Sequence, residues 1–230
     1  MIPHKILGLA ALALLGGTLF SCKDAKTADE NTEQTITILQ TADIHGQLQP
    51  HDELFWENEQ ITFRKLGGLA HMKTLFEEER SKDPEGTLIL DGGDMIQGSA
   101  VAALSHGKAF APIIKAMGYD FLIPGNWEVV YGKQTMMDVL LHYDTPVISA
   151  NMYDEASGET LFPQYFIKEL KGVKLGFISY NDPEIPVRQN PSFSTGIRFD
   201  PIDKNLEALI TELKDNQKVD LLFLVTHIGI

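Results

Sequence analysis

The segment TITILQTADIHG, residues 35–46, carries the first decisive pattern of the chain. Residues 35–41 are rich in threonine and isoleucine, which favour β-structure, and this predicts a β-strand. Asp43 and His45 come almost directly after this strand. Taken alone, they are typical of a turn, because an aspartate before a glycine bend often caps its own backbone. Their meaning therefore depends on the residues at the ends of the other strands.

Further strands and helices alternate along the chain. We expect strands at residues 35–41, 87–90, 121–123, 146–149, 173–179 and 219–226, and helices at 69–80, 109–117, 133–143 and 201–214. An antiparallel hairpin is expected at 166–177, around Lys171 and Gly172. Strands that alternate with helices of about ten residues indicate an α/β layered domain with largely parallel pairing.

Most of these strands end in carboxylate, imidazole or amide side chains. In chain order these are Asp43 and His45, Asp91 and Asp94, Asn126, Asn151, and His227. Each has a simpler explanation, either a turn or, for His227, a hydrogen-bonded core histidine. In open α/β sheets, however, the carboxyl ends of the strands line the ligand crevice, so these side chains can converge there. Two divalent cations about 3.5–4 Å apart need a shared carboxylate and flanking oxygen or nitrogen ligands, which this series supplies.

The series resembles the calcineurin-like metallophosphoesterases, and within them the N-terminal domain of the secreted 5′-nucleotidase and UDP-sugar hydrolase family. The resemblance is carried by TADIHG at 41–46, DGGD at 91–94, Gly98-Ser99, Gly125-Asn126, Ala150-Asn151 and THIG at 226–229. It implies a four-layered α/β/β/α sandwich with a dimetal centre. By this resemblance Asp43 and His45 bind the first metal, Asp94 bridges both metals, and Asn126 and His227 bind the second.

Two positions depart from the family pattern. The family places a histidine directly after the Gly-Asn asparagine and an aspartate three residues later, where this sequence has Trp127 and Val130. Tryptophan cannot transfer a proton, and general acid catalysis contributes about 10²–10⁴-fold. The catalytic group is therefore unassigned, with Glu128 or a metal-bound water as the expected substitute. The string Gly-Asn-Trp-Glu at 125–128 also resembles the Sox-type thiosulfohydrolase branch, whose leaving group needs less protonation.

The resemblance implies a 5′-nucleotidase-like hydrolase of small phosphoesters, in which a hydroxide held between two divalent metals attacks phosphorus. Imidazole and carboxylate ligands suit Zn, Mn or Fe. Two alternatives stay open: thiosulfohydrolase-like cleavage of a sulfur linkage, and a non-catalytic lipoprotein that keeps metals without hydrolysis. Asn151 is expected to contact the substrate, or else to form a strand-ending turn.

The charge and cysteine content limit the kinds of molecule and metal site that the protein can bind. The chain has 19 Lys and Arg against 32 Asp and Glu, a net charge of −13, which argues against binding of nucleic-acid polymers. A small anionic substrate is still compatible, because bound metals make a pocket locally positive. Cys22 is the single cysteine, so a metal site must be built from histidine and oxygen ligands.

The N-terminus is typical of an exported protein. Residues 1–21 form a signal peptide pattern, with a cationic start and an apolar run from Ile6 to Phe20. Cys22 after Ser21 resembles a bacterial lipobox, which implies lipidation and a periplasmic or cell-surface location on a membrane without a spanning segment. The alternative is an ordinary secretory signal with an accidental cysteine. Residues 22–34 are polar and predict a flexible tether.

Residues 35–230 are expected to form the N-terminal part of a metallophosphoesterase domain, incomplete at the C-terminus, since the family has further histidine ligands downstream and none comes after His227. Phe55 and Trp56 are expected to anchor the long loop at 47–64, with a substrate-side flap as the alternative. Surface or helix positions are expected for His51, His71, His106 and His142, and exposed salt bridges for Arg64 and Arg188.

Overall fold

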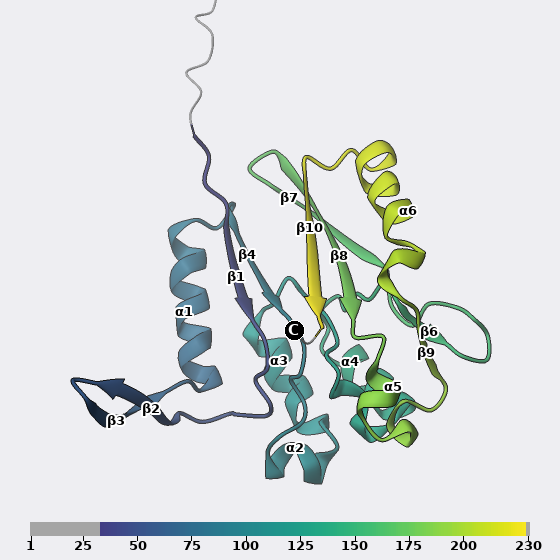
Figure 1. Cartoon of the computed structure of the whole chain (residues 1–230). Coiled ribbons are helices and arrows are strands. Elements are labelled where there is room, and N and C mark those ends of the chain that lie inside the picture. The colour runs from purple at the N-terminus through teal and green to yellow at the C-terminus, as the bar shows by residue number, and fades with distance from the viewer. Residues whose placement is uncertain (1–32, 229–230) are drawn as a thin grey trace, which may run out of the picture. The chain divides into compact units, whose positions relative to one another are not determined.

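A computed structural model describes residues 33–228, and its first sheet is parallel. Strands β1 (Thr37–Thr41), β4 (Thr87–Asp91) and β5 (Phe121–Leu122) lie side by side in the order β1-β4-β5 (Figure 1). Thr41 pairs with Asp91, so the loops after β1 and β4 leave the same edge of the sheet together. This edge carries the candidate ligands at 43, 45 and 94.

The second sheet has the order β10-β8-β7, with strands β10 (Leu221–His227), β8 (Val173–Asn181) and β7 (Tyr165–Leu170). Strands β8 and β10 pair in parallel, whereas β7 and β8 form the antiparallel hairpin expected from the sequence. Its turn residues Lys171 and Gly172 both have positive φ (50° and 77°), as a type I′ turn requires. His227 is the last residue of β10 and lies at that strand's carboxyl end.

Two sheets and two helical layers form the expected α/β/β/α sandwich. Leu88 and Leu90 of β4 face Leu175 and Phe177 of β8 in an apolar layer between the sheets. The other face of the first sheet packs on α1 (Leu69–Lys82), α3 (Ala111–Met117) and α4 (Lys133–Leu141). Beyond the second sheet lies α6 (Leu206–Thr211), whose Leu209 packs on β8. Successive residues of a strand point to opposite faces, and β4 is covered on both, so all five of its residues are buried and its centre, Leu88 to Leu90, is apolar.

Short elements connect these layers. They comprise α2 (Ala100–Ser105), α5 (Ile185–Arg188), the small antiparallel pair β6 (Met152–Asp154) and β9 (Ile197–Phe199), and 3₁₀ turns at Lys108–Phe110, Glu128–Tyr131, Pro191–Ser194 and Ile202–Lys204. No helix in the described part of the chain is long and apolar enough to cross a membrane.

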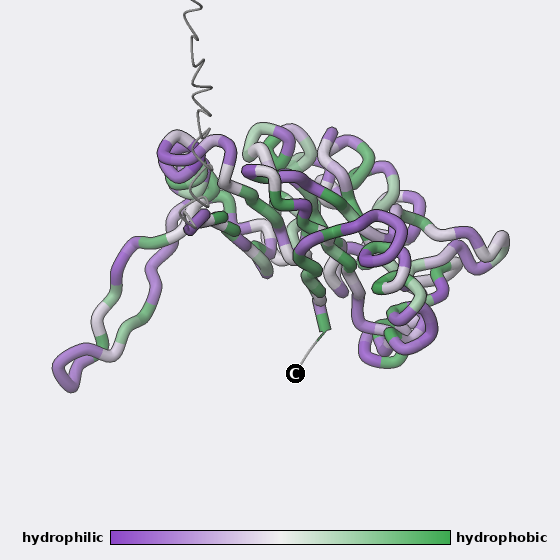
Figure 2. The backbone as a smooth tube through the Cα atoms, turned by 90° about the horizontal axis from the view of Figure 1, so that it is seen from above, coloured by the Kyte–Doolittle hydropathy of each residue, from purple (hydrophilic) through white to green (hydrophobic). Residues whose placement is uncertain are grey.

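The expected loop at 47–64 is instead largely a β-hairpin. Strands β2 (His51–Glu57) and β3 (Gln60–Leu66) pair antiparallel, and the hairpin projects away from the sheets (Figures 1 and 2). Trp56 is 69% exposed, so its expected role as a hydrophobic anchor is wrong. The alternation that forms the two strands is present in the sequence, but the body of the protein does not cover the apolar face of the hairpin.

Two other elements differ from expectation. Residues 146–149 form only an isolated bridge between Val147 and Leu122 rather than a full strand, because Pro146 has no N–H to donate. The helix expected at 201–214 is divided into a 3₁₀ turn, α6 and a π turn at Glu212–Asn216. The first break lies at Asn205, whose φ is −136° and whose side chain donates to the Ala150 carbonyl (2.8 Å).

Candidate metal centre

The loops after β1 and β4 are held together by backbone hydrogen bonds. Asp43 donates to the Gly93 carbonyl and His45 to the Asp94 carbonyl, each at 2.9 Å. Asp43, His45 and Asp94 all have positive φ, near 55°, 49° and 60°. Residues other than glycine adopt this left-handed conformation at a cost, and such positions cluster at functional sites. The backbone therefore places three candidate ligands against one another.

The side chains of Asp43, His45 and Asp94 form the first half of the site. Their ligand atoms all lie within 4.8 Å of one another. The Nε2 atom of His45 is 3.7 Å from a carboxylate oxygen of Asp43 and 3.7 Å from one of Asp94. Asp94 is 2% exposed, whereas Asp43 is open to solvent. A buried carboxylate and an accessible one around an imidazole make a donor set that suits a divalent cation.

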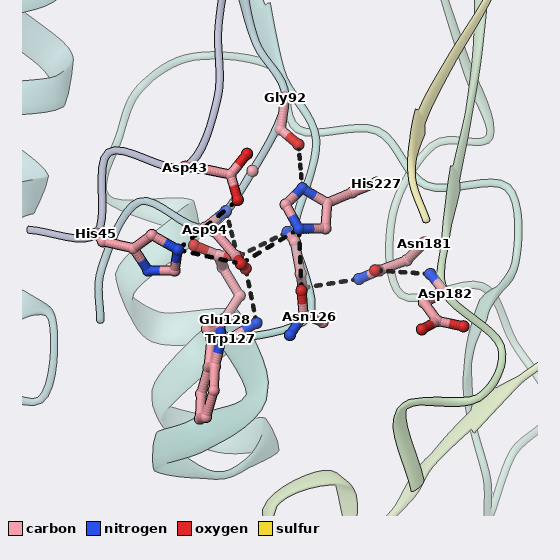
Figure 3. A network of polar contacts seen from close by, with 12 residues as sticks. Asp43, His45, Gly92, Asp94, Asn126, Trp127, Glu128, Asn181, Asp182 and His227 are labelled. Carbon is pink, nitrogen blue, oxygen red and sulfur yellow. Dashed lines mark hydrogen bonds and ion pairs between the residues drawn. The ribbon is translucent and has the colours of Figure 1, made fainter. Parts of the chain in front are cut away.

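Asp94 also faces the second half of the site. Its carboxylate lies 3.2 Å from Nε2 of His227, which is 3.0 Å from the side-chain oxygen of Asn126 (Figure 3). The Nδ1 atom of His227 is 2.7 Å from the Gly92 carbonyl, to which it donates, and this fixes the ring orientation. The structure thus brings all five predicted ligands together around Asp94, and their assignment as metal ligands stays a prediction.

The pKa of His227 depends on the polar groups around its ring. Burial by itself lowers the pKa of His227, but hydrogen bonding and the charge of Asp94 outweigh it and raise the pKa to about 9. Nε2 is surrounded by two acceptor oxygens, from Asp94 and Asn126. A positive charge must therefore lie at this point, either a proton on the ring or a bound cation. The residues present fit a metal ion.

Glu128 holds the backbone around Asp94 in place, a role that the sequence did not indicate. Its carboxylate is 1% exposed and accepts hydrogen bonds from the backbone N–H groups of Asp94 (2.9 Å), Met95 (2.7 Å) and Gly125 (2.6 Å). Burial, and then the charge of Asp94, raises the pKa of Glu128 to about 7. Both oxygens are occupied by backbone donors. The suggestion that Glu128 protonates a leaving group is therefore wrong.

The two variant positions offer no ionisable group to the site. The backbone N–H of Trp127 donates to Asp94 at 2.7 Å, while its side chain points away from the ligand cluster (Figure 3). Val130 lies in the 3₁₀ turn after it. Neither position therefore offers a proton donor to the ligand cluster.

Asn151 is part of the scaffold. It is completely buried, and its amide nitrogen donates to the carbonyls of Asn181 (2.7 Å) and Asp200 (3.1 Å). Its contact with substrate stays a prediction. Asn181, at the end of β8, was not singled out from the sequence; it donates to the Gly125 carbonyl at 2.8 Å and so ties the Asn126 loop to the second sheet. The only sequence signal was its place directly after a buried strand.

The remaining expected residues lie outside the ligand cluster. Arg188 forms an ion pair with Asp182 at 2.9 Å, and Arg64 pairs with Glu57 on the projecting hairpin. His71 is exposed on α1. The predicted signal peptide at 1–21, Cys22 and nearly all of the tether at 22–34 lie outside the described residues.

A cavity of about 600 Å³ opens beside the first half of the site. It is lined by residues 40–45 and by Gln47, His51, Gly67, Gly68 and Met72. A smaller cavity of about 330 Å³ is lined by Asp43, Asn126 and His227. A small molecule therefore has space on both sides of Asp43.

The chain is similar to known proteins over nearly its whole length. The family model described as calcineurin-like phosphoesterase matches residues 36–230. A 5′-nucleotidase of Vibrio vulnificus is 32% identical over all of this chain, and protein UshA of Escherichia coli is 28% identical over 95% of it. The chain spans only 40% and 38% of these two relatives.

Solved structures share the fold. The NAD nucleotidase of Haemophilus influenzae superposes with a TM-score of 0.72 at 25% identity, covering 83% of this chain and 34% of that one. The sulfate thiohydrolase SoxB of Thermus thermophilus superposes with a TM-score of 0.76 at 21% identity, covering 88% and 45%, and shows the fold alone. These matches confirm the resemblance and the fold predicted from the sequence. The chain belongs to the calcineurin-like phosphoesterase family.

Proposed function

We propose that the protein is a two-metal hydrolase of small phosphoesters, similar in activity to a 5′-nucleotidase. The observation that supports this most directly is the convergence of four candidate ligand side chains, those of Asp43, His45, Asn126 and His227, on the Asp94 carboxylate. Asp43 and His45 would hold one divalent cation, Asn126 and His227 the other, and Asp94 would contact both. The 5′-nucleotidases of Vibrio species with which the chain shares 30–32% identity support the substrate class.

Two bound cations would supply Lewis acid chemistry, polarising a phosphoryl oxygen and activating water for attack. Zn, Mn or Fe suits the imidazole and carboxylate set. The chain itself contributes positioning. Gly92 orients the His227 ring through its carbonyl, and Glu128 fixes the backbone of the Asp94 loop. The accessible Asp43 and the adjoining cavities leave room for a small anionic substrate.

We further propose that the protein acts outside the cytoplasm, anchored to a bacterial membrane through a lipidated Cys22. The support is the sequence of residues 1–22, with its apolar run that ends at a single cysteine. Incorporation of radiolabelled palmitate into the parent protein but not into a Cys22→Ala variant would support this anchor. Incorporation of the label into the variant would exclude it.

One observation favours a second candidate reaction. Trp127 provides no proton donor beside the ligand cluster, and a thiosulfonate-type linkage has a leaving group that needs little protonation. Thiosulfohydrolase-like cleavage therefore stays the alternative. A non-catalytic metal-binding protein is the third outcome.

Metal analysis and a substrate panel separate these functions. We expect the full-length protein, loaded with Mn or Zn, to hydrolyse a nucleotide and a nitrophenyl phosphate. We expect Asp94→Asn to lose bound metal and activity, while the matched surface variant Asp138→Asn keeps both. Hydrolysis of a thiosulfonate conjugate alone would select the second reaction. Stoichiometric metal without turnover on any substrate would select the non-catalytic protein.

A further inference from the structure

His51 lines the same large cavity as Asp43 and His45 of the ligand cluster. The cavity of about 600 Å³ is lined by Asp43 and His45 on the strand β1 side and by His51 at the start of the projecting hairpin. Of the two imidazoles that line it in the described part of the chain, His45 belongs to the candidate ligand set. His51 is then the imidazole of this cavity that is free to act on a bound molecule.

A carboxylate fixes the His51 ring. Its Nε2 atom lies 3.0 Å from an oxygen of Glu53. The two side chains share one face of β2, because residues two apart in a strand point the same way. Gly67 comes directly after β3 and lies next to the His51 ring. A Cβ atom on Gly67 would lie 3.2 Å from Cε1 of His51, so the missing side chain lets the ring lie close to the backbone. An imidazole whose one nitrogen is held by a carboxylate is oriented to transfer a proton through the other.

Asp43 and Asp94 belong to the candidate ligand set, and the two buried acids Glu128 and Asp91 are not available for this task. Both oxygens of Glu128 are held by backbone N–H groups, and the side chain is buried. Asp91 is also buried, and its carboxylate accepts from the Thr41 hydroxyl (2.6 Å) and the Gly93 N–H (2.9 Å). In contrast, the side chains of His51 and Glu53 are 46% and 51% exposed, so water can restore the proton after each turnover.

We propose that His51, held by Glu53, donates a proton to the leaving oxygen of the ester; this rests on the proposed phosphoester hydrolysis. Water forms the new bond to phosphorus through its oxygen. The bond between phosphorus and the leaving oxygen breaks, and its electron pair stays on that oxygen. The imidazolium of His51 supplies the proton that completes the alcohol. The proton lost by the attacking water passes to solvent, from which His51 is reprotonated.

This role predicts a dependence on the leaving group. An alkoxide is a poor leaving group and needs the proton, whereas nitrophenolate leaves readily without it. General acid catalysis contributes about 10²–10⁴-fold, so His51→Asn should lower kcat/KM for an alkyl phosphate by about that factor. The same variant should lower kcat/KM for 4-nitrophenyl phosphate by less than about threefold. Glu53→Gln should show the same pattern with a smaller loss, since it removes orientation only.

The matched control is His142→Asn at the C-terminal end of α4, where His142 contacts the Asp138 carbonyl and does not line this cavity. It should hydrolyse both substrates like the parent. If the parent hydrolyses both substrates and His51→Asn lowers neither, or lowers both equally, the inference is wrong while the proposed function stands. If the metal-loaded parent hydrolyses neither, the proposed function fails, and the inference with it.

A binding measurement gives a readout independent of turnover. Phenylphosphonate cannot be hydrolysed at its carbon–phosphorus bond and carries an organic group in place of the leaving group. In the Zn-loaded protein it should shift the ring resonances of His51, identified by their absence in His51→Asn, and leave those of His142 unchanged. Bound phosphonate that does not move the His51 resonances would contradict the assignment.

Discussion

The carboxylate of Glu128 accepts a hydrogen bond from the backbone N–H of Asp94 at 2.9 Å, so a buried acid holds Asp94, the residue at the centre of the site, in place. Glu128→Gln replaces one acceptor oxygen with an NH₂ group that faces backbone donors. We expect the free energy of unfolding to fall by about 2–3 kcal/mol, as for a charged hydrogen bond lost in a buried site. Urea unfolding and metal titration would measure this loss and the accompanying fall in metal affinity. The exposed variant Glu155→Gln serves as control, and equal stability of both variants would contradict the role.

A glycine contact sets the distance between the β4 and β5 loops. A Cβ on Gly93 would come 2.4 Å from the backbone nitrogen of Gly125, and Gly93 has a φ of 99°. We expect Gly93→Ala to prevent metal binding and to lower stability by more than about 2 kcal/mol, because backbone atoms cannot move aside. Gly158 also has positive φ (76°) but has nothing within 4 Å, so Gly158→Ala should cost only about 1 kcal/mol. Calorimetry of both variants tests this difference in stability. Equal losses of stability in Gly93→Ala and Gly158→Ala would contradict it.

Asp91 makes stability depend on pH. Burial raises its pKa to about 7, despite the hydrogen bond from Thr41. Because the folded pKa lies above the unfolded value, the unfolded chain releases this proton first as pH rises. The contribution of Asp91 should therefore be full below about pH 4 and be lost towards pH 7, by at most about 1.4 kcal/mol per pH unit. Asp91→Asn should remove that slope.

Chemical unfolding of the metal-free protein at several pH values between 4 and 8 would show this difference in slope. The surface variant Asp203→Asn should retain the parent's pH dependence. Parallel curves for the parent and Asp91→Asn would mean that Asp91 is already ionised in the folded protein at low pH.

The apolar face of the hairpin should contribute little to stability. Cross-strand register places Leu54, Trp56, Ile61 and Phe63 on one face, and all four are more than half exposed. Trp56→Ser should change the free energy of unfolding by no more than about 0.5 kcal/mol, whereas truncating the buried Phe177 to alanine should cost about 3–5 kcal/mol. Thermal unfolding measures both. A large loss in Trp56→Ser would show that the hairpin packs on something in solution.

The sequence predicted the ligand cluster because its information is local. Asp43, Asp94 and His227 each lie at or shortly after the carboxyl end of a strand, and the carboxyl ends of parallel strands meet at one edge. Glu128 escaped prediction because its role depends on three backbone N–H groups that no side-chain pattern records. The alternation of strands and helices predicted a layered α/β domain, and the family resemblance supplied the four layers.

The errors arose where tertiary contacts override local preference. Asn205 interrupts a helical pattern because its side chain donates a hydrogen bond to the Ala150 carbonyl. Trp56 was expected to anchor the loop at 47–64 on the protein, yet the hairpin that carries it projects from the body of the domain. Both outcomes depend on neighbours distant in the chain.

The placement of the two tryptophans gives the protein a spectroscopic property. The chain has only Trp56 and Trp127; the first is solvent-exposed on the hairpin, and the second is half-buried and bonded through its backbone to Asp94. Their fluorescence should accordingly separate into a red-shifted component from Trp56 and a component from Trp127 that responds to charge at the ligand cluster. In Trp56→Phe, intrinsic emission becomes a single-site optical reporter of cation occupancy, with no dye attached.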